Sequence, residues 1–423
     1  MKVLILNTSE TVGGAAVAAR RLKNALLKAG EYVLMLVRDK QTTDRNVIEV
    51  NTNSVDRKIN WLCFVWERLV IFFSNGLNRE NLFKVSIANC GVNNSFLSVV
   101  NDMDIIHLHW INQGFLSLKQ IKEIAKSGKP VVWTMHDMWP CTAICHYSWD
   151  CERFHNECGM CPFLRSSNEE DLSQRVWKKK RFFSSSGIQF VAVSSWLAKQ
   201  AQESSLMKGL DIKVIPNVID TTVFFQKDQL EIRKSLGLPL DKKIILMGAA
   251  RLDDPIKGFQ YLKEALKILS PNRTDILLIL FGSIKNSESF FQELSVPYIS
   301  LGLLTDNNQI SDLYSAANVT VVPSLYETFG QTLIEAMACG CPTVSFNNSG
   351  QTDIIDHQVN GFLAEYKNST DLAAGISWVL DRKDQKSLED ACIRNVHEHY
   401  TEQVVAKQYI KLYNELLQKG SIN

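Results

Sequence analysis

Two glutamates stand at a spacing that suits the binding of hydroxyl groups beside a phosphate. Glu327 and Glu335 have seven residues between them, and Phe329 and Gly330 lie in that interval. The pattern predicts a loop containing Glu327, followed by a helix over 331–339 that carries Glu335. Carboxylates accept hydrogen bonds from hydroxyls such as those of a ribose or another sugar, and a helix N-terminus favours a phosphate. A pair of solvated glutamates at a helix cap is the alternative.

Two cations follow another strand-like segment. Arg251 and Lys257 flank a short loop after the apolar run 243–249. A planar guanidinium and a compact ammonium at a strand end suit a diphosphate, and a solvated surface pair is the alternative. Asp253 and Asp254 are adjacent in this loop and are interpreted as turn residues. Because no Asp-x-Asp pair is placed to bridge a metal ion to the diphosphate, we expect no catalytic metal.

A pair of glycines follows the first strand-like run. Gly13 and Gly14 precede an alanine-rich stretch that predicts a helix. Without a side chain the backbone can approach a ligand closely, and the helix N-terminus favours an anion or a hydroxyl. The pair lacks the GxGxxG spacing of dinucleotide sites, so a tight turn is the alternative.

Residues 141–162 hold five of the ten cysteines and two of the eight histidines. Cytosolic thiols are usually reduced, which favours a metal site over a disulfide framework. The best four-ligand set consists of Cys145, Cys151, Cys158 and Cys161. Four thiolates suit a structural zinc ion, a closed site with no position left for catalysis. His146 or His155 could replace one cysteine, and reduced cysteines or a disulfide are the alternatives to zinc.

The elements that position these residues recur in two series. Apolar runs occur at 3–7, 32–37, 105–110, 131–136 and 190–195, and again at 243–249, 276–282, 298–302, 319–324 and 343–347. Apolar strands that alternate with helices predict parallel sheets covered on both faces, here as two Rossmann-like domains. Ligands of such sheets bind beyond the carboxyl ends of the strands. Two domains that face each other would bring both sets of loops into one cleft.

Pro and Asn residues near 215–221 interrupt the pattern and place the domain boundary. The prediction is an N-terminal domain over 1–214 and a C-terminal domain over 215–400. Residues 401–423 form a last helix that we expect to pack back on the N-terminal domain.

Composition and charge bear on which partners and which location we expect for the protein. The 423 residues carry a formal net charge of +1, which gives no reason to expect nucleic acid as a partner. The N-terminus reads as a strand rather than a signal peptide, so we expect a cytoplasmic protein. Charged Glu67 and Arg68 interrupt the apolar stretch 60–73, which is too short to span a membrane. A helix there could lie in a membrane interface, or it could pack against its own domain.

Several motifs together resemble glycosyltransferase family 4. They are the Glu327 and Glu335 pair, RLDDPIKG at 251–258 and VIPNVIDTTVF at 214–224, and the resemblance covers nearly the whole chain. The family implies a GT-B α/β fold, retention of configuration, and a nucleotide-diphosphate sugar donor held by the C-terminal domain. The segments HLHW and TMHDMWPCT look most like bacterial transferases that build exopolysaccharide, capsule or lipopolysaccharide chains. The acceptor implied is a glycan or lipid-linked glycan, with peripheral contact to the inner face of the plasma membrane through 60–73.

The resemblance also implies roles for single residues. The donor side consists of Gly14, Arg251, Lys257, Glu327, Phe329, Gly330 and Glu335. Arg251 and Lys257 would stabilise the charge that develops on the leaving diphosphate, Glu335 would bind the ribose, and Glu327 the sugar. His136 matches the acceptor-side histidine and completes the catalytic set with Glu327, Arg251 and Lys257.

Two further histidines receive separate interpretations, and the sequence departs from the family pattern at two places. His109 could line the acceptor site, whereas His107 is assigned to the core. Val218 stands where many members have glycine, and SGQTD at 349–353 replaces the frequent Gly-Gly-x-Pro-Glu loop. The competing hypotheses are another GT-B enzyme, such as a nucleotide-sugar epimerase, and a non-catalytic sugar-nucleotide-binding scaffold.

Overall fold

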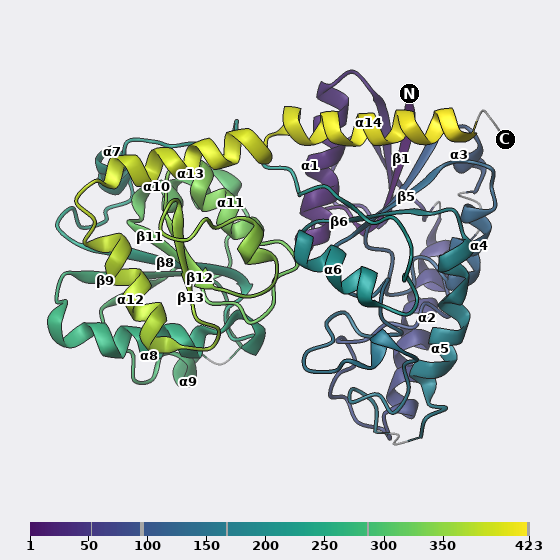
Figure 1. Cartoon of the computed structure of the whole chain (residues 1–423), viewed down its shortest axis with the longest axis horizontal. Helices are drawn as coiled ribbons and strands as arrows, with labels where there is room; N and C mark the ends of the chain where they lie inside the picture. The colour runs from purple at the N-terminus through teal and green to yellow at the C-terminus, as the bar shows by residue number, and fades with distance from the viewer. Residues whose placement is uncertain (52, 94–96, 166–167, 286, 421–423) are drawn as a thin grey trace. The chain divides into compact units, whose positions relative to one another are not determined.

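A computed structural model describes residues 1–51, 53–93, 97–165, 168–285 and 287–420 of the chain. The chain divides into two compact units (Figure 1). Unit 1 comprises Met1–Pro216 and Val405–Asn423, and unit 2 comprises Asn217–Val404. The sequence prediction put the boundary between residues 214 and 215.

Unit 1 is built on one sheet whose strand pairs are all parallel in the described residues. Its strands are β1 (Lys2–Ser9), β2 (Tyr32–Asp39), β3 (Val47–Glu49), β4 (Ile105–Leu108), β5 (Val131–Met135), β6 (Gln189–Ala192) and β7 (Lys213–Val214). Their order is β3-β2-β1-β4-β5-β6-β7. The order reverses between β1 and β4, and this switch point is where ligands of such sheets bind. The strands β3 and β7 are too short to give a sequence signal.

The helices of unit 1 connect these strands. They are α1 (Gly14–Lys28), α2 (Ser54–Ser74), α3 (Leu97–Asn101), α4 (Leu118–Ala125), α5 (Leu172–Lys180) and α6 (Ser195–Glu203), with 3₁₀ turns η2 (Arg153–His155) and η3 (Arg181–Ser185). Side-chain caps fix several starts, because a capping oxygen satisfies an amide that the helix leaves open. Asn53 caps α2, and Ser117 forms a capping box with Gln120 at α4.

The last helix, α14 (Glu402–Gly420), packs on the sheet of unit 1 and confirms the expected return of the chain (Figure 1). Tyr409 and Tyr413 on this helix are buried, and their hydroxyls lie 2.8 Å from Thr134 Oγ1 and 2.7 Å from His107 Nδ1. These polar contacts fix the position of the helix in addition to its apolar packing.

Unit 2 repeats the same plan with the strand order β10-β9-β8-β11-β12-β13. Its strands are β8 (Lys243–Arg251), β9 (Ile276–Ser283), β10 (Tyr298–Ser300), β11 (Val319–Val322), β12 (Thr343–Phe346) and β13 (Gly361–Ala364). Its helices are α7 (Gln229–Ser235), α8 (Phe259–Leu269), α9 (Ser287–Phe291), α10 (Asn307–Ala316), α11 (Gln331–Ala338), α12 (Ser369–Leu380) and α13 (Gln385–His399), with 3₁₀ turns η4 (Pro255–Lys257), η5 (Ser270–Asn272) and η6 (Ser349–Asp353). The switch point of this sheet lies between β8 and β11. The predicted fold class of two parallel α/β sheets is confirmed.

Helix α2 is amphipathic with its polar side inward. Glu67 is fully buried and accepts the backbone N–H groups of Ile87 and Ala88 at 2.7 and 2.9 Å. The neighbouring Arg68 pairs with Glu67 at 2.8 Å and donates to the backbone of the same irregular segment. A disulfide joins Cys63 of α2 to this segment at Cys90. The polar side therefore supplies hydrogen bonds that a segment without regular structure needs, while the apolar side faces outward.

The outward side of α2 consists of Val55, Ile59, Trp61, Leu62, Trp66, Leu69 and Phe73. Trp66 is 56% exposed and Phe73 is 65% exposed. We call this set of residues the α2 stripe. The helix packs against its own domain, as one of the two predictions states, but it does so with its polar side, and its apolar side is exposed. Among the described residues, no helix has both the length and the apolar character needed to cross a membrane.

Candidate functional site

In unit 2 the switch point gathers the two segments that the sequence singled out. Arg251 ends β8, and Glu327 lies in the loop after β11, the neighbouring strand. The 3₁₀ turn η4 carries Lys257 back toward this loop, because Leu325 N–H donates to Ile256 O at 2.8 Å. The predicted diphosphate-binding and sugar-binding residues are therefore neighbours in space.

Lys257 and Glu327 form an ion pair. The Nζ of Lys257 donates to Oε1 of Glu327 at 2.6 Å, and both side chains are partly accessible. Gly258 makes this approach feasible: its φ is +67°, and a Cβ there would lie 1.9 Å from the carbonyl oxygen of Pro323. The ammonium is thus held beside a carboxylate, at the strand end where the sequence predicts a diphosphate site.

Arg251 is held by the acidic turn that follows it. Its Nε donates to Oδ1 of Asp253 at 3.2 Å, and the backbone N–H of Lys285 donates to the other oxygen at 3.1 Å. Burial raises the pKa of Asp253, but these hydrogen bonds outweigh it and leave that pKa below its usual value. Asp254 caps the turn η4 through the N–H of Ile256. Both aspartates thus stabilise the turn through hydrogen bonds, and the carboxylate of Asp253 orients the guanidinium of Arg251.

Helix α11 presents its N-terminus and Glu335 in the same region. Gly330 is the N-cap residue with a φ of +115°, and the preceding Phe329 is buried. Glu335 is half-buried and lies 3.4 Å from the hydroxyl of Tyr314 on α10. The helix begins with Gln331 as predicted, so its open amides lie next to the loop that carries Glu327.

The unusual SGQTD segment supports the Glu327 loop. Gly350 N–H donates to Glu327 O at 2.7 Å, and Glu327 N–H donates to Ser349 Oγ at 3.1 Å. Gln351 is fully buried and donates through Nε2 to Ser324 O at 2.9 Å. The 3₁₀ turn η6 thus fixes the backbone of Glu327. The sequence marked this segment as a departure from the family, but only the structure gives it this positioning role.

A polar cavity in unit 2 lies at the opposite edge of the sheet. It has a volume of about 630 Å³, and its walls include Lys243, Asn318, Pro342 and Glu389. The first three of these residues begin β8 or directly precede β11 and β12, which places the cavity at the amino ends of the strands. Ligands of parallel sheets bind at the carboxyl ends, so the switch point is the better candidate site.

In unit 1 the corresponding position is the start of α1. Gly13 has a φ of +96°, and a Cβ on either Gly13 or Gly14 would meet no atom within 4 Å. The helix begins at Gly14 directly after the turn that follows β1. The space around these glycines leaves room for a ligand, and the positive φ gives Gly13 an independent reason to be glycine. Gly14 belongs to a different unit from the other predicted donor residues.

Three histidines line up at the carboxyl ends of β4 and β5. Nδ1 of His109 lies 2.8 Å from Nε2 of His136, and the two rings stack. His109 is only 3% exposed, and its Nε2 has no hydrogen-bond partner among the described residues. His107 is fully buried, with its Nε2 2.7 Å from Thr134 Oγ1. His109 therefore lies behind His136, rather than lining an open site as the sequence suggested.

The protein around these histidines keeps them neutral. Burial lowers the pKa of His107 to about 3 and that of His136 to about 4. Burial, followed by the two neighbouring imidazoles, also lowers the pKa of His109 well below its usual value. The residue His136 is partly accessible, and its lowered pKa makes it a neutral imidazole near pH 7. That form can orient a hydroxyl by accepting or donating one hydrogen bond.

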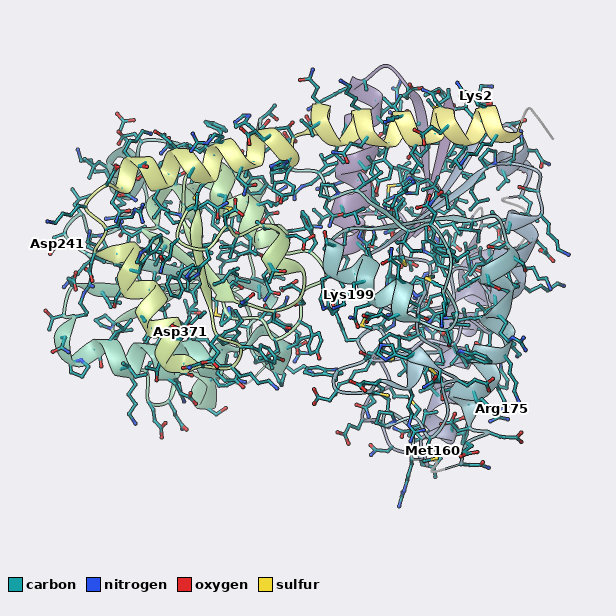
Figure 2. The ribbon with its side chains drawn as sticks, viewed as in Figure 1. Lys2, Met160, Arg175, Lys199, Asp241 and Asp371 are labelled. Atoms are coloured by element: carbon teal, nitrogen blue, oxygen red, sulfur yellow. A yellow bond between two sulfur atoms is a disulfide. The ribbon has the colours of Figure 1, made fainter. Side chains whose placement is uncertain are left out.

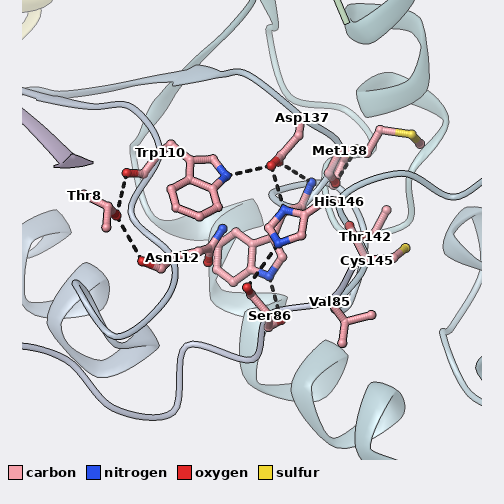
Figure 3. Close-up of polar contacts among 12 residues, drawn as sticks. Thr8, Val85, Ser86, Trp110, Asn112, Asp137, Met138, Thr142, Cys145 and His146 are labelled. Carbon is pink, nitrogen blue, oxygen red and sulfur yellow. Dashed lines mark hydrogen bonds and ion pairs between the residues drawn. The ribbon is translucent and has the colours of Figure 1, made fainter. Parts of the chain in front are cut away.

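Asp137 anchors a buried hydrogen-bond chain just behind His136 (Figure 3). Its Oδ2 lies 2.8 Å from Trp110 Nε1 and 2.7 Å from His146 Nδ1, and His146 Nε2 lies 3.1 Å from Ser86 Oγ. Ser86 is fully buried, which leaves no access for a substrate, so the serine-histidine-aspartate chain is structural. Sequence reasoning missed it, although the dipeptide of His136 and Asp137 directly after a strand was a signal.

The predicted metal ligands surround one small cavity. Cys145, Cys151, Cys158 and Cys161 all line it. Figure 2 labels Met160, which lies between two of these cysteines in the loop that follows β5. Among the described residues, no group of three or more His, Cys, Asp or Glu side chains is arranged to hold a metal ion as the structure stands.

Comparisons with known proteins agree with this architecture. Residues 12–223 match the family described as Glycosyltransferase Family 4, and residues 228–399 match Glycosyl transferases group 1. An uncharacterized glycosyltransferase of Methanocaldococcus jannaschii is 29% identical over 324 residues, which cover 74% of this chain and 76% of that protein.

Two solved structures share the fold over almost the whole chain. Sucrose-phosphate synthase from Thermosynechococcus elongatus has a TM-score of 0.71 at 19% identity and covers 99% of this chain and 100% of its own. Anabaena HepE in complex with UDP and glucose has a TM-score of 0.65 at 18% identity, with 98% of this chain and 100% of its own covered. The predicted GT-B fold is confirmed, and since the first family match spans half of the sequence, the chain belongs to glycosyltransferase family 4 and is a glycosyltransferase.

Proposed function

We propose that this glycosyltransferase moves a sugar from a nucleotide-diphosphate sugar to a growing surface-polysaccharide or lipid-linked glycan, with retention of configuration. The observation that carries the donor assignment is the meeting of Arg251, Lys257 and Glu327 with the start of α11 at one switch point. Cations and open amides there suit a diphosphate, and carboxylates suit the hydroxyls on either side of it.

In this proposal the bond from the anomeric carbon to the diphosphate breaks while the acceptor oxygen bonds to the same face of that carbon. The electron pair of the broken bond stays on the diphosphate, which takes up the acceptor proton. Arg251 and Lys257 stabilise the charge as it develops, the role that a catalytic metal would otherwise fill. Glu327, released from Lys257 by the incoming diphosphate, accepts hydrogen bonds from the sugar.

Unit 1 supplies the acceptor side of the proposal. Neutral His136 orients the acceptor hydroxyl and does not itself need to carry a charge. Its Nε2 is engaged by His109, which holds the ring in one orientation. His109 is thus a positioning residue for His136.

Donor binding can be tested with matched glutamate variants. A panel of nucleotide-diphosphate sugars is screened by thermal shift, and the dissociation constant of the best donor is then measured by calorimetry. We expect Glu335→Gln to weaken donor binding by about 10- to 100-fold, because hydrogen bonds to a charged group contribute about 1.5–3 kcal/mol. Glu389→Gln, in the cavity at the opposite edge, should leave the constant unchanged. The reverse pattern would place the donor in that cavity and refute the site.

A product assay separates transfer from the competing functions. Transfer yields a glycosylated acceptor and a nucleoside diphosphate in equal amounts. Epimerised sugar without acceptor product would indicate a nucleotide-sugar epimerase. Tight donor binding without turnover on any glycan acceptor would favour a sugar-nucleotide-binding scaffold.

We also propose that the α2 stripe lies on an anionic membrane surface, at the cytoplasmic face where lipid-linked acceptors are glycosylated. The support is the inward polar side of α2, which leaves large aromatic and aliphatic side chains outward along four turns or more. Arg57 and Lys58 are exposed near the N-terminal end of the stripe and complement anionic headgroups. A Trp and a Phe on such a helix suit the boundary between headgroups and acyl chains.

Vesicle binding tests the membrane contact. Trp66→Glu should reduce co-sedimentation with vesicles that contain anionic lipid by at least about 10-fold, since burying one large apolar side chain contributes about 1.5–3 kcal/mol. Leu230→Glu is the matched control, because Leu230 is 54% exposed on α7 in unit 2. Wild-type protein that stays in the supernatant, or equal loss in both variants, would contradict the contact.

A further inference from the structure

The loop 136–171 joins β5 to α5 and is long for a connection inside an α/β domain. Among its described residues it contains the short turn η2 and an isolated β-bridge from Cys145 to Val85, and Cys145, Phe154 and Cys161 in it are buried. Connections of this length without regular structure are uncommon in compact domains and need some other source of order. The Asp137–His146 contact fixes the first part of the loop, but it does not reach the part after Trp149.

The four cysteines converge from separate parts of this loop. A cavity of about 20 Å³ is lined by Cys145, Cys151, Cys158 and Cys161, with Ile144, Phe154, Pro162 and Phe163 among the other walls. A space of that size has room for little more than one atom or one water molecule. None of the four sulfurs takes part in a disulfide in the structure. Mostly apolar walls make water a poor occupant, because a buried water needs polar partners.

Backbone donors and a buried lysine lie around the sulfurs. The backbone N–H of Ala143 bonds to the sulfur of Cys158, and that of Phe163 bonds to the sulfur of Cys161, two residues before it. Lys180 is fully buried, and its Nζ donates to Trp139 O at 2.6 Å and to Thr142 O at 3.1 Å. Four thiolates around a divalent cation carry a net charge of −2, which a basic side chain such as Lys180 can partly offset.

The histidines are less suitable ligands. Both ring nitrogens of His146 are engaged, by Asp137 at 2.7 Å and by Ser86 at 3.1 Å. His155 does not line the cavity. Cys141 is not among the lining residues either, and its sulfur donates to Met138 O at 3.1 Å. The substitution of a histidine for a cysteine, open from the sequence, is therefore not supported for His146.

We propose that Cys145, Cys151, Cys158 and Cys161 bind one structural zinc ion, which orders the loop after His136. The sulfurs do not stand at metal-ligand geometry in this structure, so Cys151, Cys158 and Cys161 must close on the ion, whereas the backbone of Cys145 is held by its bridge to Val85. Tetrahedral binding by four thiolates leaves no open position, so the ion takes no part in the transfer step. The zinc would instead set the shape of the surface beyond His136, where the proposed acceptor binds.

Metal analysis of the full-length purified protein tests this proposal. We expect about one zinc per chain in the wild type, and less than about a tenth of that in Cys158→Ser and Cys161→Ser. Cys141→Ser is the matched control and should retain zinc. Replacement of zinc by Co²⁺ should give sulfur-to-metal charge-transfer bands and the visible bands of a tetrahedral site.

Measurements on the native wild type keep the test independent of variants that fail to fold. Thiol titration without denaturant should find these cysteines protected until a strong chelator is added. A metal-free wild type from zinc-supplemented expression, with thiols equally reactive before and after chelation, would overturn the proposal. A disulfide between any two of the four, found by mass spectrometry of non-reduced peptides, would overturn it as well.

Discussion

Lys257→Ala is expected to lower kcat for sugar transfer by about 10²- to 10³-fold, while the Tm changes little. The reason is that a preorganised cation aimed at developing charge is worth about 3–4 kcal/mol of barrier. The side chain is partly accessible and, among the described residues, hydrogen-bonds to Glu327 alone, so its loss leaves the core intact. Steady-state release of nucleoside diphosphate with saturating donor and acceptor measures the effect.

Lys267→Ala is the matched control, because Lys267 is exposed on α8, the helix that Lys257 precedes. Equal kcat in Lys257→Ala and the wild type would contradict the catalytic assignment. A double-mutant cycle with Glu327→Gln distinguishes the two roles of the pair. If the ion pair only stabilises the resting enzyme, the double variant should recover activity. If both residues contact the donor, it should not.

Unit 1 is expected to lose stability as the pH falls from about 6.5 to about 4. His136 has a folded-state pKa of about 4 and His107 of about 3, both below the ordinary value of 6.5 because of burial. In that interval these imidazoles are protonated in the unfolded chain but neutral in the folded chain, so acid favours unfolding. Each pH unit by which the folded-state pKa lies below 6.5 contributes about 1.4 kcal/mol to this loss of stability. His136 alone therefore accounts for up to about 3 kcal/mol of the free energy of unfolding.

Urea unfolding followed by tryptophan fluorescence between pH 4 and pH 8 measures this dependence. Eight of the nine tryptophans lie in unit 1, so the signal reports mainly on that unit. His136→Asn should flatten the slope of unfolding free energy against pH, whatever its effect at pH 8. His399→Asn, an exposed histidine of unit 2, should leave the slope as it is. An unchanged slope in His136→Asn would show that this imidazole titrates normally.

The residues of the proposed donor side were largely predictable from sequence as strand-end neighbours. Its residues lie in short segments directly after strands, and parallel strands bring their carboxyl ends to one edge. Arg251, Lys257, Glu327 and Glu335 could therefore be placed by local pattern alone. The contact of Lys257 with Glu327 was not predictable, because it depends on the close approach of Gly258 to the backbone of Pro323.

The residues of the proposed acceptor side were predictable only in part. The strand pattern placed His136 at a strand end, but it did not show that His109 lies directly behind it. It also did not reveal that Asp137 and His146 bond to each other, since such contacts depend on how a long irregular loop folds back. Hydrogen bonds between residues far apart in sequence leave no periodic signal.

Helix α2 shows most clearly what the sequence alone could not predict. Its sequence determined a helix with one apolar and one polar side, because the spacing of side chains on a helix is fixed. It did not determine which side faces inward. The irregular segment around Ile87 and Ala88 has buried amides that need acceptors, and Glu67 supplies one at 2.7 and 2.9 Å.

The sequence by itself thus determined two parallel α/β sheets, the residues at their strand ends and the cysteine spacing, all of which follow from local chain geometry. The tertiary structure decided which of those residues contact one another, which imidazoles are buried away from solvent, and which side of α2 is buried. Hydration, charge pairing and hydrogen-bond satisfaction depend on neighbours that only the folded chain brings together.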